Sequence, residues 1–183
     1  MHRLFAALPV SDDLAERLLP LRTELHGARW RWREHFHITL HFYGRVDRDV
    51  AEEIAAALEN VEASALALRV KGVGWFGRRE PRALYARIEA SDPLSQLARA
   101  CRNIARELNL KLSSDPFIPH ITLAYCNQTP LEDVMRWSEA YQTLQTEPVL
   151  FDRFHLYESF TSDNKPSRYV AQADYPMGAA RAD

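Results

Sequence analysis

The tetrapeptide His-Ile-Thr-Leu occupies residues 37–40 and occurs again at residues 120–123 of this 183-residue chain. In both copies polar and apolar side chains alternate, which is the period of a β-strand. His37 and Thr39 therefore share one face of the first predicted strand, and the second copy repeats this division. We expect each apolar face to pack against helices and each polar face to line a central groove.

The sequence around the two tetrapeptides repeats as well. Residues 4–14 read Leu-Phe-Ala-Ala-Leu-Pro-Val-Ser-Asp-Asp-Leu and align with residues 84–94, which read Leu-Tyr-Ala-Arg-Ile-Glu-Ala-Ser-Asp-Pro-Leu. This offset is 80 residues, whereas the tetrapeptides are 83 residues apart, so the second copy carries three extra residues in between. The unit is far longer than the repeats of solenoid proteins, and we interpret it as an internal duplication.

The first half of the chain is predicted to alternate strands and helices. Leucines recur at the spacing of one helical face after Ser11 or Asp12, and Pro20 is expected to kink or break that helix. Gly44 is expected to end the strand that carries the first tetrapeptide. The predicted elements are strands over 3–9, 36–43 and 66–75 and helices from residue 11 or 12 and over 49–61.

The second half repeats this order. The predicted elements are strands over 83–90, 119–125, 149–158 and 168–174 and helices starting near residues 92 and 129. No low-complexity linker divides the halves, so we expect residues 1–177 to form one compact α+β domain of two pseudo-symmetric lobes. Two antiparallel sheets should face a central cleft with helices on the outside. Residues 178–183 are expected to form a disordered tail.

The composition indicates a globular protein, since 46% of the residues are hydrophobic. The chain lacks a run of about 18 apolar residues and an apolar signal segment at its start, so we expect a soluble, cytoplasmic protein without membrane attachment. Cys101 and Cys126 provide neither a disulfide framework nor a paired metal-binding spacing. The formal net charge is −2, so a polyanion would have to be bound locally.

Two His-x-Thr-Leu motifs in this order resemble the two-histidine (2H) phosphoesterase superfamily, and in particular its RNA 2′,3′-cyclic phosphodiesterases, historically called 2′-5′ RNA ligases. The resemblance spans nearly the whole chain. It includes residues 3–9, the first motif extended through Gly44, the strand at residues 81–85, and the second motif preceded by Pro116-Phe117-Ile118-Pro119.

This resemblance implies a bilobal fold in which His37, His120, Thr39 and Thr122 line the cleft and act without a metal or other cofactor. The implied reaction is hydrolysis of a 2′,3′-cyclic phosphate at an RNA end to a 2′-phosphomonoester. The implied partners are RNA ends or small cyclic-phosphate nucleotides, with no obligate protein partner.

The chemistry of imidazole suits this reaction. A neutral imidazole can accept a proton from water, and an imidazolium can donate one to the departing ribose oxygen. The threonine hydroxyls would stabilise the charge of the phosphorane. By analogy we expect His120 to act as the base and His37 as the acid, although the apparent twofold symmetry lets the pair serve either direction of attack.

The chain departs from its relatives at Tyr125, where they often carry an arginine that can contact phosphate or base. Arg82, in the turn after residues 75–77, and Arg168, in the final hairpin, are candidate substitutes, although each can also be an ordinary solvated charge. Phe42 is a candidate stacking partner for a nucleobase. Its alternation with the apolar residues of the motif strand favours core packing instead.

Three alternatives remain at this point. His35, His37 and His41 fall on one face of the predicted strand and could bind zinc, but His41 lies about 13 Å along the strand from His37. A non-catalytic module that binds RNA ends or nucleotides would not need a matched proton donor and acceptor. A 2′-5′ RNA ligase or a 2′-5′ oligonucleotide phosphodiesterase would use the same residues on another substrate.

Overall fold

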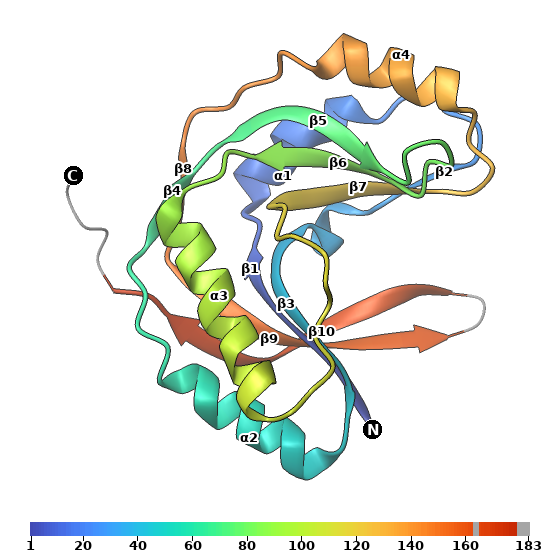
Figure 1. Cartoon of the computed structure of the whole chain (residues 1–183). Helices are drawn as coiled ribbons and strands as arrows, with labels where there is room; N and C mark the ends of the chain where they lie inside the picture. The colour runs from blue at the N-terminus through green and yellow to red at the C-terminus, as the bar shows by residue number, and fades with distance from the viewer. Residues whose placement is uncertain (163–164, 179–183) are drawn as a thin grey trace.

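The computed structural model describes the backbone of residues 1–162 and 165–178 and the side chains of residues 1–160 and 167–178 (Figure 1). No helix in these residues combines the length and apolarity that a bilayer crossing requires. The elements are β1 (His2–Pro9), α1 (Asp12–Leu18), the 3₁₀ helix η1 (Leu19–Leu21), β2 (Ala28–Trp30), the 3₁₀ helix η2 (Arg33–His35), β3 (His37–Val46), α2 (Arg48–Glu59), β4 (Leu66–Leu68), β5 (Val70–Phe76), β6 (Ala83–Ile88), α3 (Asp92–Glu107), β7 (His120–Cys126), α4 (Leu131–Tyr141), β8 (Val149–Phe151), β9 (Arg153–Ser162) and β10 (Lys165–Pro176).

One antiparallel sheet contains eight strands in the order β10-β9-β1-β3-β7-β6-β5, with β2 also paired to β7. The strands from β10 to β3 form one half of this sheet, and β7, β6, β5 and β2 form the other half. The two halves meet where Ile38 of β3 pairs with Ile121 of β7. The expected α+β fold is confirmed, and its two expected sheets are joined at this narrow seam.

Each motif strand carries a β-bulge at the leucine of its tetrapeptide. Between Thr39 and His41, the partner strand β1 advances by a single residue, so Leu40 is the extra residue of β3. Leu123 is the extra residue of β7 against β6 for the same reason. A one-residue shift moves the following side chains to the other face of a strand. Positions beyond the two leucines therefore depart from a simple period of two.

The helices connect the two halves of the sheet crosswise. Helix α3, which follows β6, packs against β3, and the Tyr43 hydroxyl of β3 donates a hydrogen bond to the Cys101 carbonyl of α3 (3.1 Å). Helix α4 covers β5, and its Trp137 indole N–H donates to the Leu21 carbonyl of η1 (3.0 Å). In Figure 1, α2 and α3 lie along one half and α4 covers the other. A single apolar core therefore runs through both halves.

The helix caps keep the spacing of the sequence repeat. The Ser11 and Ser91 hydroxyls each accept a hydrogen bond from the backbone N–H three residues later, which stabilises the starts of α1 and α3. These caps keep the predicted offset of 80 residues. The strand ladders instead match Ala7 with Tyr85, since both face the threonine of a tetrapeptide, and this offset is 78. The predicted strand alignment is therefore wrong by two residues, which preserves the face of each side chain.

Other elements also differ from expectation. Pro20 does limit α1, which ends at Leu18 and continues as η1. Gly44 does not end the first motif strand: it lies inside β3 with a φ of 79°. The predicted strand over residues 66–75 is divided into β4 and β5, and β2 was not predicted.

The predicted disordered tail is described only at its first residue. The Gly178 N–H donates a hydrogen bond to the Ala63 carbonyl (2.9 Å), so this residue is fixed to the chain before β4. Residues 179–183 lie outside the described residues.

Candidate active site

The seam between β3 and β7 brings the two tetrapeptides side by side. Because Ile38 pairs with Ile121, the register places His37 opposite Thr122, and the threonine of the first copy opposite the histidine of the second. Both isoleucines are fully buried, so the four polar side chains share the other face, where they are half-buried. The two histidines are diagonal neighbours, which in a regular antiparallel pair lie about 7–8 Å apart. One phosphate group can bridge such a pair.

Each imidazole is held by the backbone two residues before it. His37 Nδ1 lies 2.8 Å from the His35 carbonyl oxygen, and His120 Nδ1 lies 2.6 Å from the Ile118 carbonyl oxygen. A carbonyl oxygen can only accept, so each Nδ1 carries a hydrogen and donates it. This leaves both Nε2 atoms available to a substrate, in the tautomer that the fold selects.

Both imidazoles favour the neutral form. Burial lowers the pKa of His37 to about 4, against the opposing effect of its hydrogen bond to His35, and the nearby Arg31 and His120 lower it further. Burial also lowers the pKa of His120, and the hydrogen bond to the Ile118 carbonyl opposes that shift. Burial is the main cause at both imidazoles, and at His37 the Arg31 charge adds to it.

Aromatic rings from the first half of the sheet border His37. The ring centroids of Phe5 and Tyr169 lie 5.0 and 5.2 Å from the His37 ring, and Tyr157 lies at 6.3 Å. Tyr157 and Phe5 also stack on each other, with centroids 5.2 Å apart. The first imidazole is therefore fixed in a rigid apolar wall, which explains the burial that depresses its pKa.

Rings from the second half border His120 in the same way. Phe76 and Tyr85 lie 4.9 and 5.3 Å from the His120 ring. The Tyr85 ring also covers Gly74, where an added Cβ would come within 2.6 Å of it. The second wall therefore depends on a glycine in β5.

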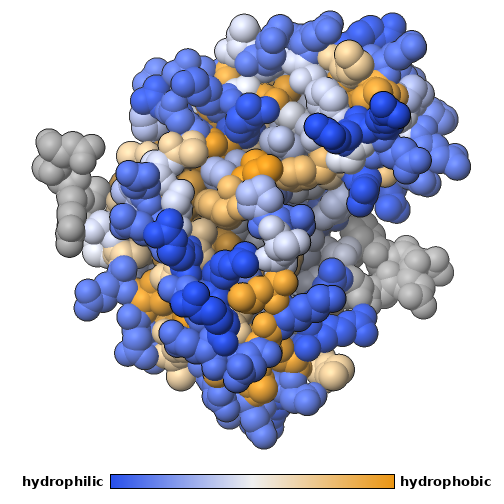
Figure 2. Space-filling view, viewed as in Figure 1, coloured by the Kyte–Doolittle hydropathy of each residue, from blue (hydrophilic) through white to orange (hydrophobic). Residues whose placement is uncertain are grey.

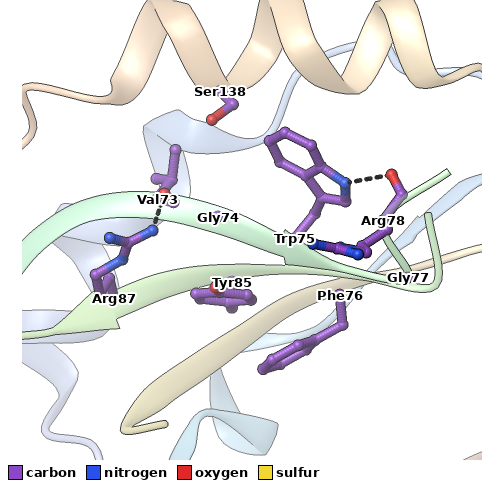
Figure 3. A pocket seen from close by; sticks show the side chains of 9 residues that line it. All are labelled: Val73, Gly74, Trp75, Phe76, Gly77, Arg78, Tyr85, Arg87 and Ser138. Atoms are coloured by element: carbon purple, nitrogen blue, oxygen red, sulfur yellow. Dashed lines mark hydrogen bonds between the residues drawn. The ribbon is translucent and has the colours of Figure 1, made fainter.

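A pocket of about 320 Å³ adjoins this second wall. Figure 3 shows Phe76 and Tyr85 on one side of the β5–β6 hairpin and Trp75 on the other side, towards Ser138 of α4. The Arg87 guanidinium reaches the Val73 carbonyl at 3.5 Å. On the face of the molecule seen in Figure 2, the outer edge is mostly hydrophilic, and apolar residues reach the surface nearer the middle.

Phe42 and Tyr125 occupy equivalent places, five residues after each motif histidine. The bulges turn both outward, so that Phe42 is 58% exposed and Tyr125 is 40% exposed. The Phe42 ring lies 5.5 Å from Phe5, the ring that also contacts His37. Core packing of Phe42 was therefore the wrong expectation, because it assumed unbroken alternation along the strand. Both aromatic side chains remain candidates for substrate contact.

The two predicted substitute arginines lie on the other face of the sheet. The Arg168 guanidinium lies 5.2 Å from the ring of its cross-strand partner Phe160, and neighbouring Tyr169 faces the opposite way, towards His37. Arg82 precedes β6, and alternation along that strand places it on the face away from Tyr85. The structure does not bring either arginine to the paired histidines.

The bulge also separates the histidines of the alternative zinc site. His41 lies beyond Leu40, and its ring lies 5.1 Å from the ring of Tyr43 rather than beside His37. The Tyr43 hydroxyl is hydrogen-bonded to α3. Burial, with a contribution from Arg102 of α3, lowers the pKa of His41 to about 4. Within the described part of the chain, no three His, Cys, Asp or Glu side chains are grouped as a metal site requires.

Arg31 is a candidate site residue that the sequence analysis did not identify. Its guanidinium lies over the rings of Tyr125 and Tyr169, at 5.2 and 5.4 Å from their centroids. The alternation in Ala-Arg-Trp-Arg-Trp at residues 28–32 is the signal that could have indicated a short strand here. Three paired residues are too few for that pattern to stand out.

Known proteins resemble the chain in sequence and in fold. A family model described as the 2′-5′ RNA ligase superfamily matches residues 10–161. A Thermotoga maritima protein named RNA 2′,3′-cyclic phosphodiesterase is 29% identical over 173 residues, which cover 90% of each chain. A Geobacillus stearothermophilus protein of the same name is 26% identical over 188 residues, which cover 94% of this chain but 56% of that protein.

Solved structures show the same fold at lower identity. The crystal structure of E. coli LigT complexed with 3′-AMP has a TM-score of 0.77 and 21% identity, and the match covers 96% of this chain and 98% of LigT. The crystal structure of a Thermus thermophilus protein, TT0787, has a TM-score of 0.76 and 21% identity, and the match covers 98% of this chain and 100% of that one.

Proposed function

Because the chain belongs to the 2′-5′ RNA ligase superfamily, we propose that it hydrolyses the 2′,3′-cyclic phosphate at an RNA end to a 2′-phosphomonoester. The paired histidines carry this proposal. They share one face of the sheet, and in each the Nδ1 atom is hydrogen-bonded to a backbone carbonyl, which leaves Nε2 for the substrate. The relatives from T. maritima and G. stearothermophilus, which are named RNA 2′,3′-cyclic phosphodiesterase, support the same reaction.

In the proposed reaction His37 is the base. Its lowered pKa of about 4 keeps it neutral, so its Nε2 takes a proton from water while the water oxygen bonds to phosphorus. His120, in its protonated form, donates its Nε2 hydrogen to the ribose 3′ oxygen as the P–O3′ bond breaks. These roles reverse the assignment by analogy, because burial, and to a lesser degree the Arg31 charge, disfavours an imidazolium at His37.

The two threonines complete the proposed site. Thr39 and Thr122 each stand opposite the histidine of the other strand, so their hydroxyls can donate hydrogen bonds to the non-bridging oxygens as charge develops. The scheme uses side chains alone and needs no metal. Each half of the sheet supplies one histidine and one threonine, so residues 1–177 act as a single catalytic domain.

The test is an assay of the purified protein in EDTA on a short RNA that ends in a 2′,3′-cyclic phosphate. We expect opening of the ring and a 2′-phosphate product, which phosphatase then removes. Parallel reactions contain ADP-ribose cyclic phosphate and 2′-5′ oligoadenylate. No turnover of either cyclic phosphate would overturn the proposal, as would a 3′-phosphate product or loss of activity in EDTA. Turnover of 2′-5′ oligoadenylate alone would favour the oligonucleotide phosphodiesterase.

A further inference from the structure

We propose that Arg31 binds a non-bridging phosphate oxygen of the substrate and thereby fixes the phosphorus atom between His37 and His120. The identity of the substrate rests on the proposed function, whereas the anion site itself can be tested without turnover. The contacts of Arg31 with the second motif strand and with both halves of the sheet, and a ring that it shares with His37, support this role.

The second motif strand fixes the backbone of Arg31. Strand β2 pairs with β7 so that Arg29 stands opposite Tyr125, and the Arg31 N–H then donates to the Leu123 carbonyl (2.7 Å). Trp30 points to the other face, where its ring packs 6.2 Å from Trp137 of α4. Alternation therefore places Arg31 on the face of β7 that carries Tyr125 and the motif histidine.

Two tyrosines from opposite halves of the sheet hold the guanidinium. Tyr125 belongs to β7 and Tyr169 to β10, and the Arg31 guanidinium lies over both rings. The Tyr169 ring is also an edge-on neighbour of His37, at 5.2 Å. Arg31 and His37 thus contact the same ring. Stacking uses the faces of the guanidinium and leaves its in-plane N–H groups free to bind oxygen atoms.

One of these N–H groups has no acceptor. Arg31 Nη2 is buried and has no hydrogen-bond partner among the described residues. A buried donor without a partner is costly, and an arginine donor is best satisfied by an oxyanion. A phosphate oxygen beside His37 would supply this acceptor, which gives the otherwise unfavourable placement a physical reason.

The experiment compares Arg31→Gln and Arg31→Lys with Arg22→Gln. Arg22 is a matched control, because its guanidinium lies over the ring of Trp32 at 5.1 Å, and among the described residues no hydrogen bond or ring contact joins it to the four motif side chains. Adenosine 2′-monophosphate is the probe and adenosine is the ligand control without phosphate. Binding of each is measured by titration calorimetry, thermal melting tests the fold, and kcat/KM is measured on the cyclic-phosphate RNA.

We expect Arg31→Gln to weaken binding of adenosine 2′-monophosphate by about ten- to a hundred-fold, the range for a hydrogen bond to a charged group. Adenosine binding and the melting temperature should stay unchanged, Arg31→Lys should recover part of the loss, and kcat/KM should fall in parallel. Arg22→Gln should behave like the unsubstituted protein.

Three results would overturn this role of Arg31. They are unchanged binding of the monophosphate by Arg31→Gln, an equal loss for adenosine, and a loss explained by a lower melting temperature. The proposed function fails separately. If Arg31→Gln turns over RNA normally, only the arginine assignment is wrong. If the unsubstituted protein binds the monophosphate through Arg31 without hydrolysing RNA, only the reaction is wrong.

Discussion

Ile38 and Ile121 face each other where β3 meets β7, and both are completely buried. The pairing is antiparallel, so the residues before Ile38 meet those after Ile121 and the reverse. The histidine of each strand stands opposite the threonine of the other. One pair of apolar residues, matched across the two strands, therefore sets the register of the whole candidate site.

Ile38→Ala should destabilise the protein by about 2–5 kcal/mol, because it leaves a cavity at a fully buried position. Ile121→Ala should cost a similar amount, and activity should fall with each because the seam is disturbed. Urea unfolding and the RNA assay measure both effects. Leu150→Ala is the control, since Leu150 is 60% exposed in β8. If both alanine variants keep full stability, the seam does not depend on this pair.

His37→Ala and His120→Ala should each lower the turnover of cyclic-phosphate RNA by about 10²- to 10⁴-fold, the usual contribution of a general acid or base. Both side chains are half-buried polar groups, so the melting temperature should change little. His26→Ala is the control, because His26 is exposed in the loop before β2. Near-full activity of either motif variant would contradict the mechanism.

Acid should destabilise the folded state. The unfolded His37 binds a proton near pH 6.5 and the folded one only near its lowered pKa of about 4, so stability should fall as the pH drops through this window. His41, whose pKa is also lowered to about 4, acts in the same direction. Urea unfolding between pH 7 and pH 4 measures the loss. A stability that rises as the pH falls from 7 to 4 would contradict the lowered pKa of His37.

The titration of His37 itself gives a residue-specific check. The charged and titratable groups near its ring are Arg31, His35, His120, Tyr157 and Tyr169. Arg31→Gln removes the cation of this set, so the pKa of His37 should rise in part, while burial, the larger cause, keeps it below 6.5. Proton NMR of the imidazole Hε1 resonances follows this shift. An unchanged His37 titration in the variant would mean that the guanidinium does not influence it.

Phe42→Ala should weaken binding of substrates that carry a nucleobase, because base–aromatic stacking is worth about 1–3 kcal/mol per base. The effect should appear mainly in KM and should be absent for a ribose cyclic phosphate without a base. Phe160→Ala is the matched control, since Phe160 is also exposed (41%) but faces Arg168 on the other side of the sheet. Equal losses with and without the base would argue against stacking.

Gly74→Ala should destabilise the protein by about 1–3 kcal/mol, as overpacking of a close contact usually does. The added Cβ would press on the Tyr85 ring, which contacts His120, so turnover should fall too. Combining it with Tyr85→Leu should cost less than the sum of the two single changes, which a double-mutant cycle measures. Gly178→Ala is the control, because its Cβ would meet only an ordinary 3.7 Å contact.

Local patterns along the chain were enough to predict several features of this protein. The alternation in the two tetrapeptides placed each histidine with its threonine on one strand face, and the serine caps marked the starts of α1 and α3. These features are decided within a few residues of the chain. The family resemblance then followed from the order of the two motifs.

The other side chains of the site are brought there by long-range contacts. Phe42 is exposed because of a bulge at Leu40, and that bulge exists only in the pairing of β3 with β1. Arg31 is placed by a bond to Leu123, more than ninety residues later in the chain. The depressed pKa of His37 likewise comes from groups on other strands. Such contacts join distant segments, so no local periodicity encodes them.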